Sequence, residues 1–281
     1  MTAFMPLRDA IATFVNDGQV LALEGFTHLI PMAAGQEIAR QRRRGLTLVR
    51  MTPDVIYDQL IGAGCATRLV FSWGGNPGVG SLHRLRDAVE HAWPQPLQLE
   101  EYSHAAMAAA YTAGASGLPF AVLRAFQGTD LPANNRNIRR VACPFTGEEL
   151  AAVPALRPDV TIIHAQQADR VGNVRIRGIV GVQKEAVLAA RIAIVTVEEI
   201  VERVTDEMNA VVLPSLVVHA VCHVPRGAYP SYAHGWYDRD NAFYEAWDGI
   251  ARDRDAFARW MERHVHATPD WAAYLRLADV R

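Results

Sequence analysis

The sequence predicts an α/β fold with a mostly parallel sheet. Two observations carry this prediction: short β-branched apolar runs recur along the chain, and the stretches between them have apolar residues at helical spacing. Strands that alternate with helices pair in parallel, because each helical crossover returns the chain to the same end of the sheet. The alternation covers most of the 281 residues without a low-complexity linker. We therefore expect one domain over residues 1–281.

The N-terminal half is predicted as a helix, a turn and then alternating strands and helices. Apolar residues between Pro6 and Asn16 have helical spacing, and Asp17 and Gly18 break this helix before an apolar run at 20–23. A second helix begins near Pro31 and ends in a cluster of arginines. The elements that follow alternate in the same way: strand 46–49, helix 55–63, strand 68–72, helix 82–92 and strand 97–101.

The C-terminal half repeats this pattern and then changes character. Residues 183–190 read as a helix that lies between two β-branched runs, and such runs predict strands over 160–164, 192–197 and 211–213. Residues 241–266 combine many charges with apolar residues spaced for one helix face. We expect a C-terminal helical segment over about 241–281 that packs across the α/β body.

Composition argues against several classes of function. The formal net charge is −2, and the basic residues are scattered except at 40–44, so we expect no nucleic-acid partner. No apolar run reaches the length of about 18 residues that suggests a membrane span, and the N-terminus lacks the pattern of a signal peptide. We expect a protein that is neither exported nor inserted in a membrane.

The three cysteines, Cys65, Cys143 and Cys222, match neither a metal knuckle nor a disulfide framework. Their small or apolar neighbours favour buried structural thiols in a reducing compartment, which indicates the cytoplasm. Metal-ligand spacing is absent from the whole sequence, so we expect no metal cofactor.

The first segment with chemical potential is LEGFTHLIP at 23–31, where a predicted strand turns through Gly25 and Phe26 into a helix. Backbone N–H groups at such a turn can bind a carboxylate, a phosphate or a developing oxyanion. An ordinary strand-to-helix turn that needs a glycine is an equally good explanation.

The second segment is a glycine-rich loop, FSWGGNPGVGSLHR at 71–84, between a predicted strand and a predicted helix. Such a loop lets a ligand approach the backbone closely, and it carries two hydroxyls and an amide that can hydrogen-bond a carboxylate or a carbonyl. A purely structural loop is the alternative. The candidate ligand-binding residues here are Ser72, Gly74, Gly75, Asn76 and Ser81.

Two further segments are weaker candidates. Glu101, in LEEYSH, stands at a predicted strand end beside a hydroxyl and an imidazole, where a carboxylate can act as a base or a nucleophile. A surface role is the leading explanation on composition alone. His164 is isolated, and the polar stretch Asp169 to Asn173 is better explained as a turn held by a side-chain cap.

Several long strings resemble the A subunits of class I CoA-transferases, of the glutaconate and 3-oxoadipate types. The similarity runs from about residue 6 to about residue 265, and these strings occur in family order: LEGFTHLIP, FSWGGNPGVGSLHRLRDAVE, LEEYSHA, GASGLPFAVLR, CPFTGEEL and YAHGWYDRDN.

The resemblance implies an open α/β sandwich and an active site shared with a B subunit. The nucleophile of the family is a glutamate of that partner, which forms an acyl anhydride and then a glutamyl-CoA thioester in a ping-pong reaction. The substrates implied are an acyl-CoA, such as succinyl-CoA, and a small dicarboxylic or 3-oxo acid. By the same resemblance, Ser72 and Ser81 line the carboxylate pocket, and the backbone of Gly25 and Phe26 borders the reacting acyl group.

Three functions follow as hypotheses. The first is the A subunit of a CoA-transferase, most simply one that exchanges CoA between succinyl-CoA and 3-oxoadipate in aromatic degradation. The second is an acyl-CoA hydrolase that uses Glu101, although ring-opening hydrolases of the superfamily carry an acidic residue near the position of His104. The third is a non-catalytic sensor of small acids, because a fold does not fix a function.

Overall fold

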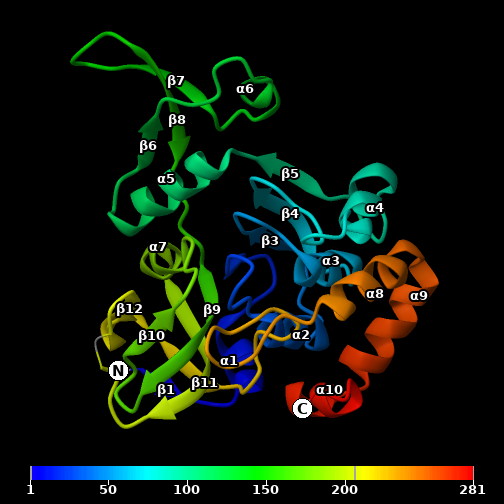
Figure 1. The fold of residues 1–281 in the computed structure, drawn as a ribbon. Helices are drawn as coiled ribbons and strands as arrows, with labels where there is room; N and C mark the ends of the chain where they lie inside the picture. Colours follow the sequence, from blue (N-terminus) through cyan, green and yellow to red (C-terminus); the bar gives the residue numbers. More distant parts are fainter. Residues whose placement is uncertain (1, 206, 281) are drawn as a thin grey trace.

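The computed structural model describes residues 2–205 and 207–280, and its centre is a large twisted sheet (Figure 1). Eight strands form one continuous path in the order β1-β13-β11-β9-β2-β3-β4-β5, and every pairing along this path is parallel. The predicted α/β fold with a mostly parallel sheet is confirmed. The strands of the path are β1 (Ala3–Phe4), β2 (Val20–Glu24), β3 (Leu46–Val49), β4 (Ala66–Phe71), β5 (Gln98–Glu101), β9 (Val160–Asp169), β11 (Ile192–Val201) and β13 (Ala220–His223).

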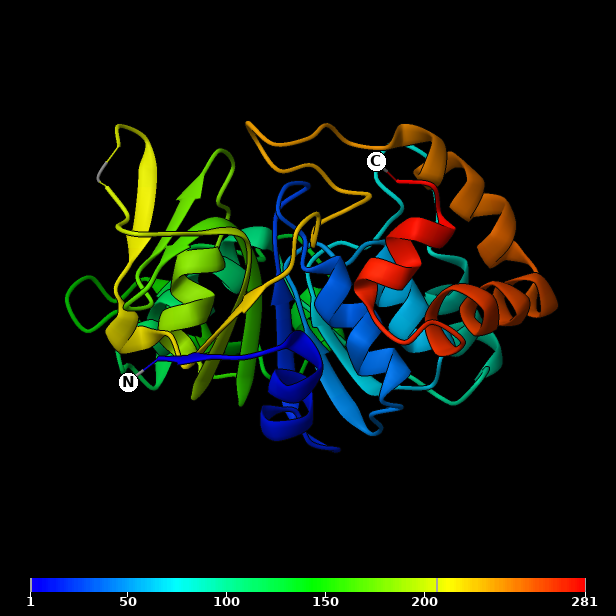
Figure 2. The same ribbon diagram turned by 90° about the horizontal axis from the view of Figure 1, so that it is seen from below.

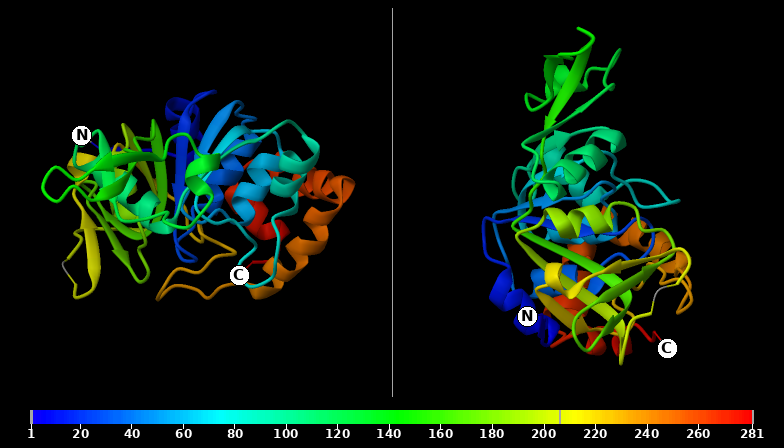
Figure 3. Two further views of the ribbon diagram at one scale, coloured as in Figure 1. Left: turned by 90° about the horizontal axis from the view of Figure 1, so that it is seen from above. Right: turned by 90° about the vertical axis from the view of Figure 1, so that its left-hand side faces the viewer.

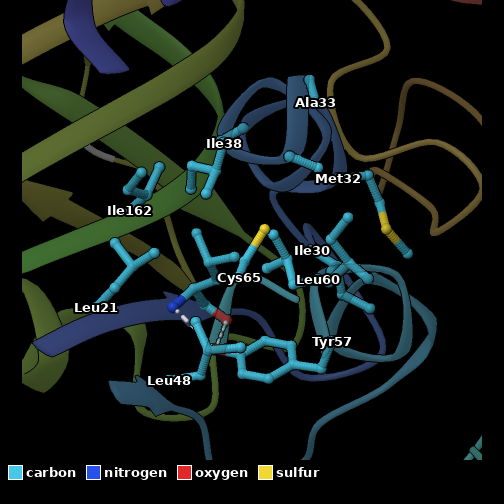
Figure 4. Packing of buried hydrophobic residues seen from close by; sticks show 14 of the residues in the cluster. Leu21, Ile30, Met32, Ala33, Ile38, Leu48, Tyr57, Leu60, Cys65 and Ile162 are labelled. Carbon is cyan, nitrogen blue, oxygen red and sulfur yellow. Dashed lines mark hydrogen bonds between the residues drawn. The ribbon is translucent and has the colours of Figure 1, made fainter. Parts of the chain in front are cut away.

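Helices cover both faces of the sheet, as strands buried on two sides require. One face carries α1 (Leu7–Phe14), α2 (Met32–Arg40), α3 (Val55–Gly62) and α4 (His83–His91), and the other carries α5 (His104–Ala115) and α7 (Gln183–Ala189). Figure 4 shows the first core, where Leu21 of β2 and Ile162 of β9 lie beside Ile38 of α2. Neighbouring strands thus bury their apolar side chains against one helix.

The C-terminal helices pack on the outside of α2, α3 and α4 (Figure 2). They are α8 (Asn241–Arg252), α9 (Arg254–Met261), the π-helical turn Glu262–His266, and α10 (Trp271–Leu277). The sequence predicts one helix over 241–266, but the helix breaks at Asp253, whose extended backbone ends α8 and whose side chain caps α9. Trp247 and Tyr274 join the core that α2 and α3 build.

A three-stranded antiparallel sheet projects from the body and was not predicted (Figure 3). It consists of β6 (Phe120–Leu123), β7 (Arg139–Ala142) and β8 (Glu149–Pro154), with the short helix α6 (Leu131–Asn134) beside it. We call residues 118–156 the projecting unit. Two more strands, β10 (Val174–Arg177) and β12 (Ala210–Leu213), pair antiparallel beside β9, and a 3-10 turn follows at Ser215–Val217.

Residues 224–240, between β13 and α8, cross the sheet at the carboxyl ends of its central strands (Figure 2). Val224 donates its N–H to the Val197 carbonyl at the end of β11. Further along, Leu29 donates its N–H to the Tyr232 carbonyl at 3.0 Å, beyond the end of β2. We call residues 224–240 the crossing loop.

In the part of the chain that the structure describes, no helix combines the length and the apolar character needed to cross a membrane. Cys65 and Cys222 are buried, as expected. Cys143 is not: it is half-buried at the start of the turn that joins β7 to β8.

Candidate active site

The carboxyl ends of β2, β3, β4 and β5 lie at one edge of the sheet, and the candidate residues gather there. Parallel strands end at a common edge, where loops from several strands can build one site. A cavity of about 280 Å³ opens at this edge. Residues from all four strand ends line it: Phe26, Thr27, Arg50, Thr52, Asp54, Trp73, Pro77, Gly78 and His104.

The turn after β2 is compact. A Cβ atom at Gly25 would lie 2.8 Å from the Leu29 carbonyl oxygen and 2.9 Å from the His28 carbonyl oxygen, so only glycine fits. Thr27 and Leu29 have left-handed backbones, with φ of 56° and 52°. This conformation costs roughly 1–3 kcal/mol for such residues and persists only where the surroundings impose it.

The crossing loop imposes this conformation. Ser231 Oγ donates to the Thr27 carbonyl at 2.9 Å, and the Leu29 N–H donates to Tyr232. His28, fully buried, accepts the His234 N–H at its Nε2, so its proton is on Nδ1, which faces the Ile179 carbonyl at 3.1 Å. Burial lowers the pKa of His28 to about 4, which keeps the imidazole neutral.

Arg50, directly after β3, lies under this turn. The side chain is 1% exposed, and Nη2 donates to the Gly25 carbonyl at 2.8 Å while Nη1 donates to Asp54 Oδ1 at 2.9 Å. Asp54 also accepts the Ile56 N–H and so caps α3. The turn after β2 and the start of α3 are therefore tied together through one buried ion pair.

Glu24, the last residue of β2, is also buried. Its Oε1 accepts the Met51 N–H at 3.1 Å and the Tyr111 hydroxyl at 2.8 Å. Burial raises the pKa of Glu24 to about 7, against the opposing effects of Arg50 and Tyr111. The contacts of Glu24 join β2, β3 and α5 beneath the site.

Ser72 and His104 form a pair at the ends of β4 and β5. The Ser72 hydroxyl donates to the Met51 carbonyl at 2.7 Å, so it accepts from His104 Nδ1, which lies 3.1 Å away. His104 is exposed at the first turn of α5, whose N-terminus is capped by Ser103. Ser72 thus fixes the orientation of the His104 ring.

The glycine-rich loop is folded back on itself, with a bridge between Asn76 and Gly80. The Asn76 amide donates to the Tyr244 carbonyl at 2.7 Å and so ties the loop to α8. At Gly75 a Cβ atom would lie 2.6 Å from the Trp73 ring, whereas Gly74 is exposed. Ser81 is half-buried after this bridge and does not line the cavity described above.

The structure thus brings Phe26 and His104 to the cavity, with Gly25 and Ser72 directly behind them. Glu101 is exposed at the end of β5, and its side chain does not line the cavity. The neighbouring Glu100 is buried instead and accepts from the Tyr102 hydroxyl, Asn137 and Arg68.

The fourth sequence segment forms the capped turn that was predicted. Asp169 Oδ1 accepts the N–H groups of Val171 and Asn173, at 3.1 Å and 2.9 Å. His164 is not isolated, because its Nε2 lies 2.7 Å from Glu198 Oε1, which also accepts from Tyr237. This buried group anchors the crossing loop to β9 and β11.

Sequence reasoning missed Arg50, Thr52 and Asp54. All three follow a correctly predicted strand, 46–49, and the rule that parallel strands share a carboxyl edge would have pointed to them. No sequence signal links Ser231 or His234 to the turn after β2, because the contacts span about two hundred residues.

Comparisons with known proteins agree with this geometry. The family described as Coenzyme A transferase matches residues 4–223. The A subunit of 3-oxoadipate CoA-transferase from Pseudomonas knackmussii is 63% identical, over 98% of this chain and 97% of that protein. The A subunit of glutaconate CoA-transferase from Acidaminococcus fermentans is 34% identical, over 98% of this chain and 91% of that protein.

The crystal structure of glutaconate coenzyme A-transferase from Acidaminococcus fermentans has the same fold. It matches with a TM-score of 0.91 at 33% identity, over 99% of this chain and 93% of that one. Fold and site together define an α/β enzyme subunit that presents a cavity at the carboxyl edge of a parallel sheet. The chain belongs to the coenzyme A transferase family, and it is an A subunit of such an enzyme.

Proposed function

We propose that this A subunit works in a transferase that moves CoA from succinyl-CoA to 3-oxoadipate. The observation that carries the proposal is the 63% identity with the A subunit of a 3-oxoadipate CoA-transferase over nearly the whole chain. Glutaconate is the alternative acceptor, by similarity to the glutaconate enzyme. The catalytic partner is a B subunit that supplies the nucleophilic glutamate.

The proposed reaction proceeds by covalent catalysis. The partner's carboxylate attacks the thioester carbonyl, CoA thiolate leaves, and an acyl anhydride forms. The thiolate then attacks the glutamyl carbonyl of the anhydride, which releases the first acid and leaves a glutamyl-CoA thioester. The acceptor acid reverses both steps, so that each half of the reaction passes through a tetrahedral oxyanion.

This chain's role is to bind and to stabilise. Among the described residues, the N–H groups of Phe26 and Thr27 have no hydrogen-bond acceptor within the protein, and both residues line the cavity. They are suited to donate to the oxyanion. His104 lines the cavity and is suited to contact the acid's carboxylate, while Ser72, which donates its proton to the Met51 carbonyl, holds the His104 ring in place. Ser81, Gly74, Gly75 and Asn76 shape the loop that borders the cavity.

The test is an assay of thioester transfer from succinyl-CoA to 3-oxoadipate, with this chain by itself, with a cognate B subunit by itself, and with both. We expect transfer only in the mixture, and a covalent CoA adduct on the partner that mass spectrometry finds. A CoA adduct on this chain, or transfer without a partner, would contradict the proposal.

Glu101→Ala distinguishes the hydrolase alternative in the same assay. The Glu101 side chain does not line the cavity, so we expect this variant to transfer CoA at close to the unaltered rate. Release of CoA to water that disappears in Glu101→Ala would establish the hydrolase instead.

A further inference from the structure

The peptide between Gly25 and Phe26 is held from below by a buried charge. Its carbonyl accepts from Arg50 Nη2 at 2.8 Å. In a trans peptide the C=O and N–H groups point in opposite directions, so this bond turns the Phe26 N–H away from the guanidinium. Phe26 lines the cavity.

Arg50 is well fixed for this task. Asp54 accepts hydrogen bonds from both terminal nitrogens of Arg50, at 2.9 Å and 3.4 Å. The Arg50 guanidinium also lies 5.5 Å from the centre of the Tyr57 ring. A planar fork held on two sides has few alternative orientations. The donor to Gly25 is therefore preorganised.

The hydrogen bond from Arg50 to the Gly25 carbonyl also continues the connection between β2 and β3 beyond the point where their backbone pairing stops. The last paired residues of β2 and β3 are Ala22 and Val49. Beyond them, the Met51 N–H donates to Glu24 Oε1, and the Arg50 side chain donates in the same direction to Gly25. These two hydrogen bonds connect the residues after β3 to the turn after β2.

We propose that Arg50, which borders the cavity but is only 1% exposed, is a positioning residue for acyl transfer that acts through the Gly25–Phe26 peptide. Its charge at the carbonyl polarises the peptide and strengthens the Phe26 N–H as a donor to the developing oxyanion. The catalytic part of this inference rests on the proposed function.

Arg50→Lys, in the complex with the B subunit, tests the inference. Lysine keeps the charge beside Asp54, but its ammonium cannot reproduce the fork that reaches both Asp54 and Gly25. We expect kcat to fall by about 10- to 100-fold, with little change in KM for the acyl-CoA. Amide exchange in a peptide that covers residues 24–30, followed by mass spectrometry, should become faster.

Arg84→Lys is the matched control. Arg84 is also buried, at 3% exposed, and has the same three kinds of partner: a carboxylate (Asp87), a backbone carbonyl (Arg252) and an aromatic ring (Trp93). It lies on α4, away from the turn. The Arg84→Lys complex should have the kcat of the unaltered complex, and amide exchange at residues 24–30 should also be unchanged.

Amide exchange decides the positioning independently of activity. Unchanged exchange at 24–30 in Arg50→Lys overturns the inference even if the enzyme transfers CoA as proposed. If Arg50→Lys shows faster amide exchange but has the same kcat as Arg84→Lys, the catalytic role of Arg50 is overturned. If the unaltered complex transfers no CoA, the proposed function fails, while exchange still reports whether Arg50 holds the turn.

A second variant covers the case in which Arg50→Lys does not fold. Arg50→Met combined with Asp54→Asn leaves no unpaired buried charge and keeps a side-chain oxygen to cap α3. The donor to Gly25 is lost, so the same fall in kcat and the same faster exchange are expected. Unaltered values of both would overturn the inference.

Discussion

At the scale of single residues, the buried Glu24 makes the stability of the folded chain depend on pH. Burial raises its pKa to about 7, from an ordinary value of 4.5. Between those values the folded chain holds a proton that the unfolded chain has lost, so the contribution of Glu24 to stability declines as the pH rises.

Glu24→Gln should remove that decline, because glutamine keeps an oxygen for Met51 and Tyr111 but does not ionise. The difference in unfolding free energy between the variant and the unaltered chain should therefore shift in favour of the variant by roughly 2 to 3 kcal/mol as the pH rises from about 5 to about 8. Urea unfolding at several pH values measures this. Parallel stability curves for the two proteins would show that the Glu24 pKa is not raised.

Gly25 admits no side chain, so Gly25→Ala should displace the turn and reduce transfer by about tenfold or more, since small misplacements at a reacting centre are costly. Gly249→Ala is the control: Gly249 lies within α8 with open space around its Cβ position. That substitution should raise stability by about 0.5 to 1 kcal/mol and leave transfer unaltered. Equal transfer by both variants would contradict the argument from close contact.

Candidate residues were predictable from sequence where they follow a predicted strand. Gly25 and Ser72 are of this kind, and the family strings contain both. In the segment LEEYSH the sequence pointed to Glu101, whereas the structure places His104 at the cavity. Arg50 was predictable in principle but its role was not, because a buried arginine at the end of a strand looks like any other charged residue in sequence. Its significance comes from the Gly25 carbonyl, which only the fold brings near.

At the scale of elements, α4 begins without a capping side chain of its own. Asp58, within α3, replaces it: the carboxylate accepts the N–H groups of Arg84 and Leu85 at 2.8 Å and 2.9 Å, and Trp247 Nε1 at 3.1 Å. Burial raises the pKa of Asp58 to about 6. One carboxyl group thus joins α3, α4 and α8.

Asp58→Ala should cost roughly 3 to 5 kcal/mol, because it leaves three donors unsatisfied, two of them backbone groups of one helix end. Asp253→Ala removes an exposed local cap from α9 and should cost about 1 kcal/mol. Chemical denaturation of the two variants makes the comparison. A loss for Asp58→Ala no larger than that for Asp253→Ala would mean that the shared cap contributes little.

Strands of the parallel sheet were predictable because they are buried on both faces and therefore read as continuous apolar runs. The strands of the projecting unit were not. Phe120 and Val122 are each 45% exposed, and β7 begins with two exposed arginines, so neither strand has the apolar pattern of a buried one. The break at Asp253 was missed because the apolar spacing continues from α8 into α9.

At the scale of the whole molecule, the direction in which strands are added to the sheet reverses between β2 and β9. From β2 the chain builds the sheet outward through β3, β4 and β5, and the later half adds β9, β11 and β13 on the other side. In open α/β sheets a ligand site forms at such a switch point. The turn after β2 lies there, which explains why its supports come from both halves of the chain.

The dependence of Thr27 on Ser231 also has a consequence for biosynthesis. A ribosome releases the N-terminal half first, so β2 and its turn emerge long before the residue that is 204 positions downstream. The nascent sheet can assemble, but the hydrogen bonds that Ser231 and Tyr232 make to Thr27 and Leu29 are still missing. A chain that terminates early, before Ser231, would therefore carry the strands of the family without a shaped site. The turn after β2 can therefore take its final shape only as translation nears its end.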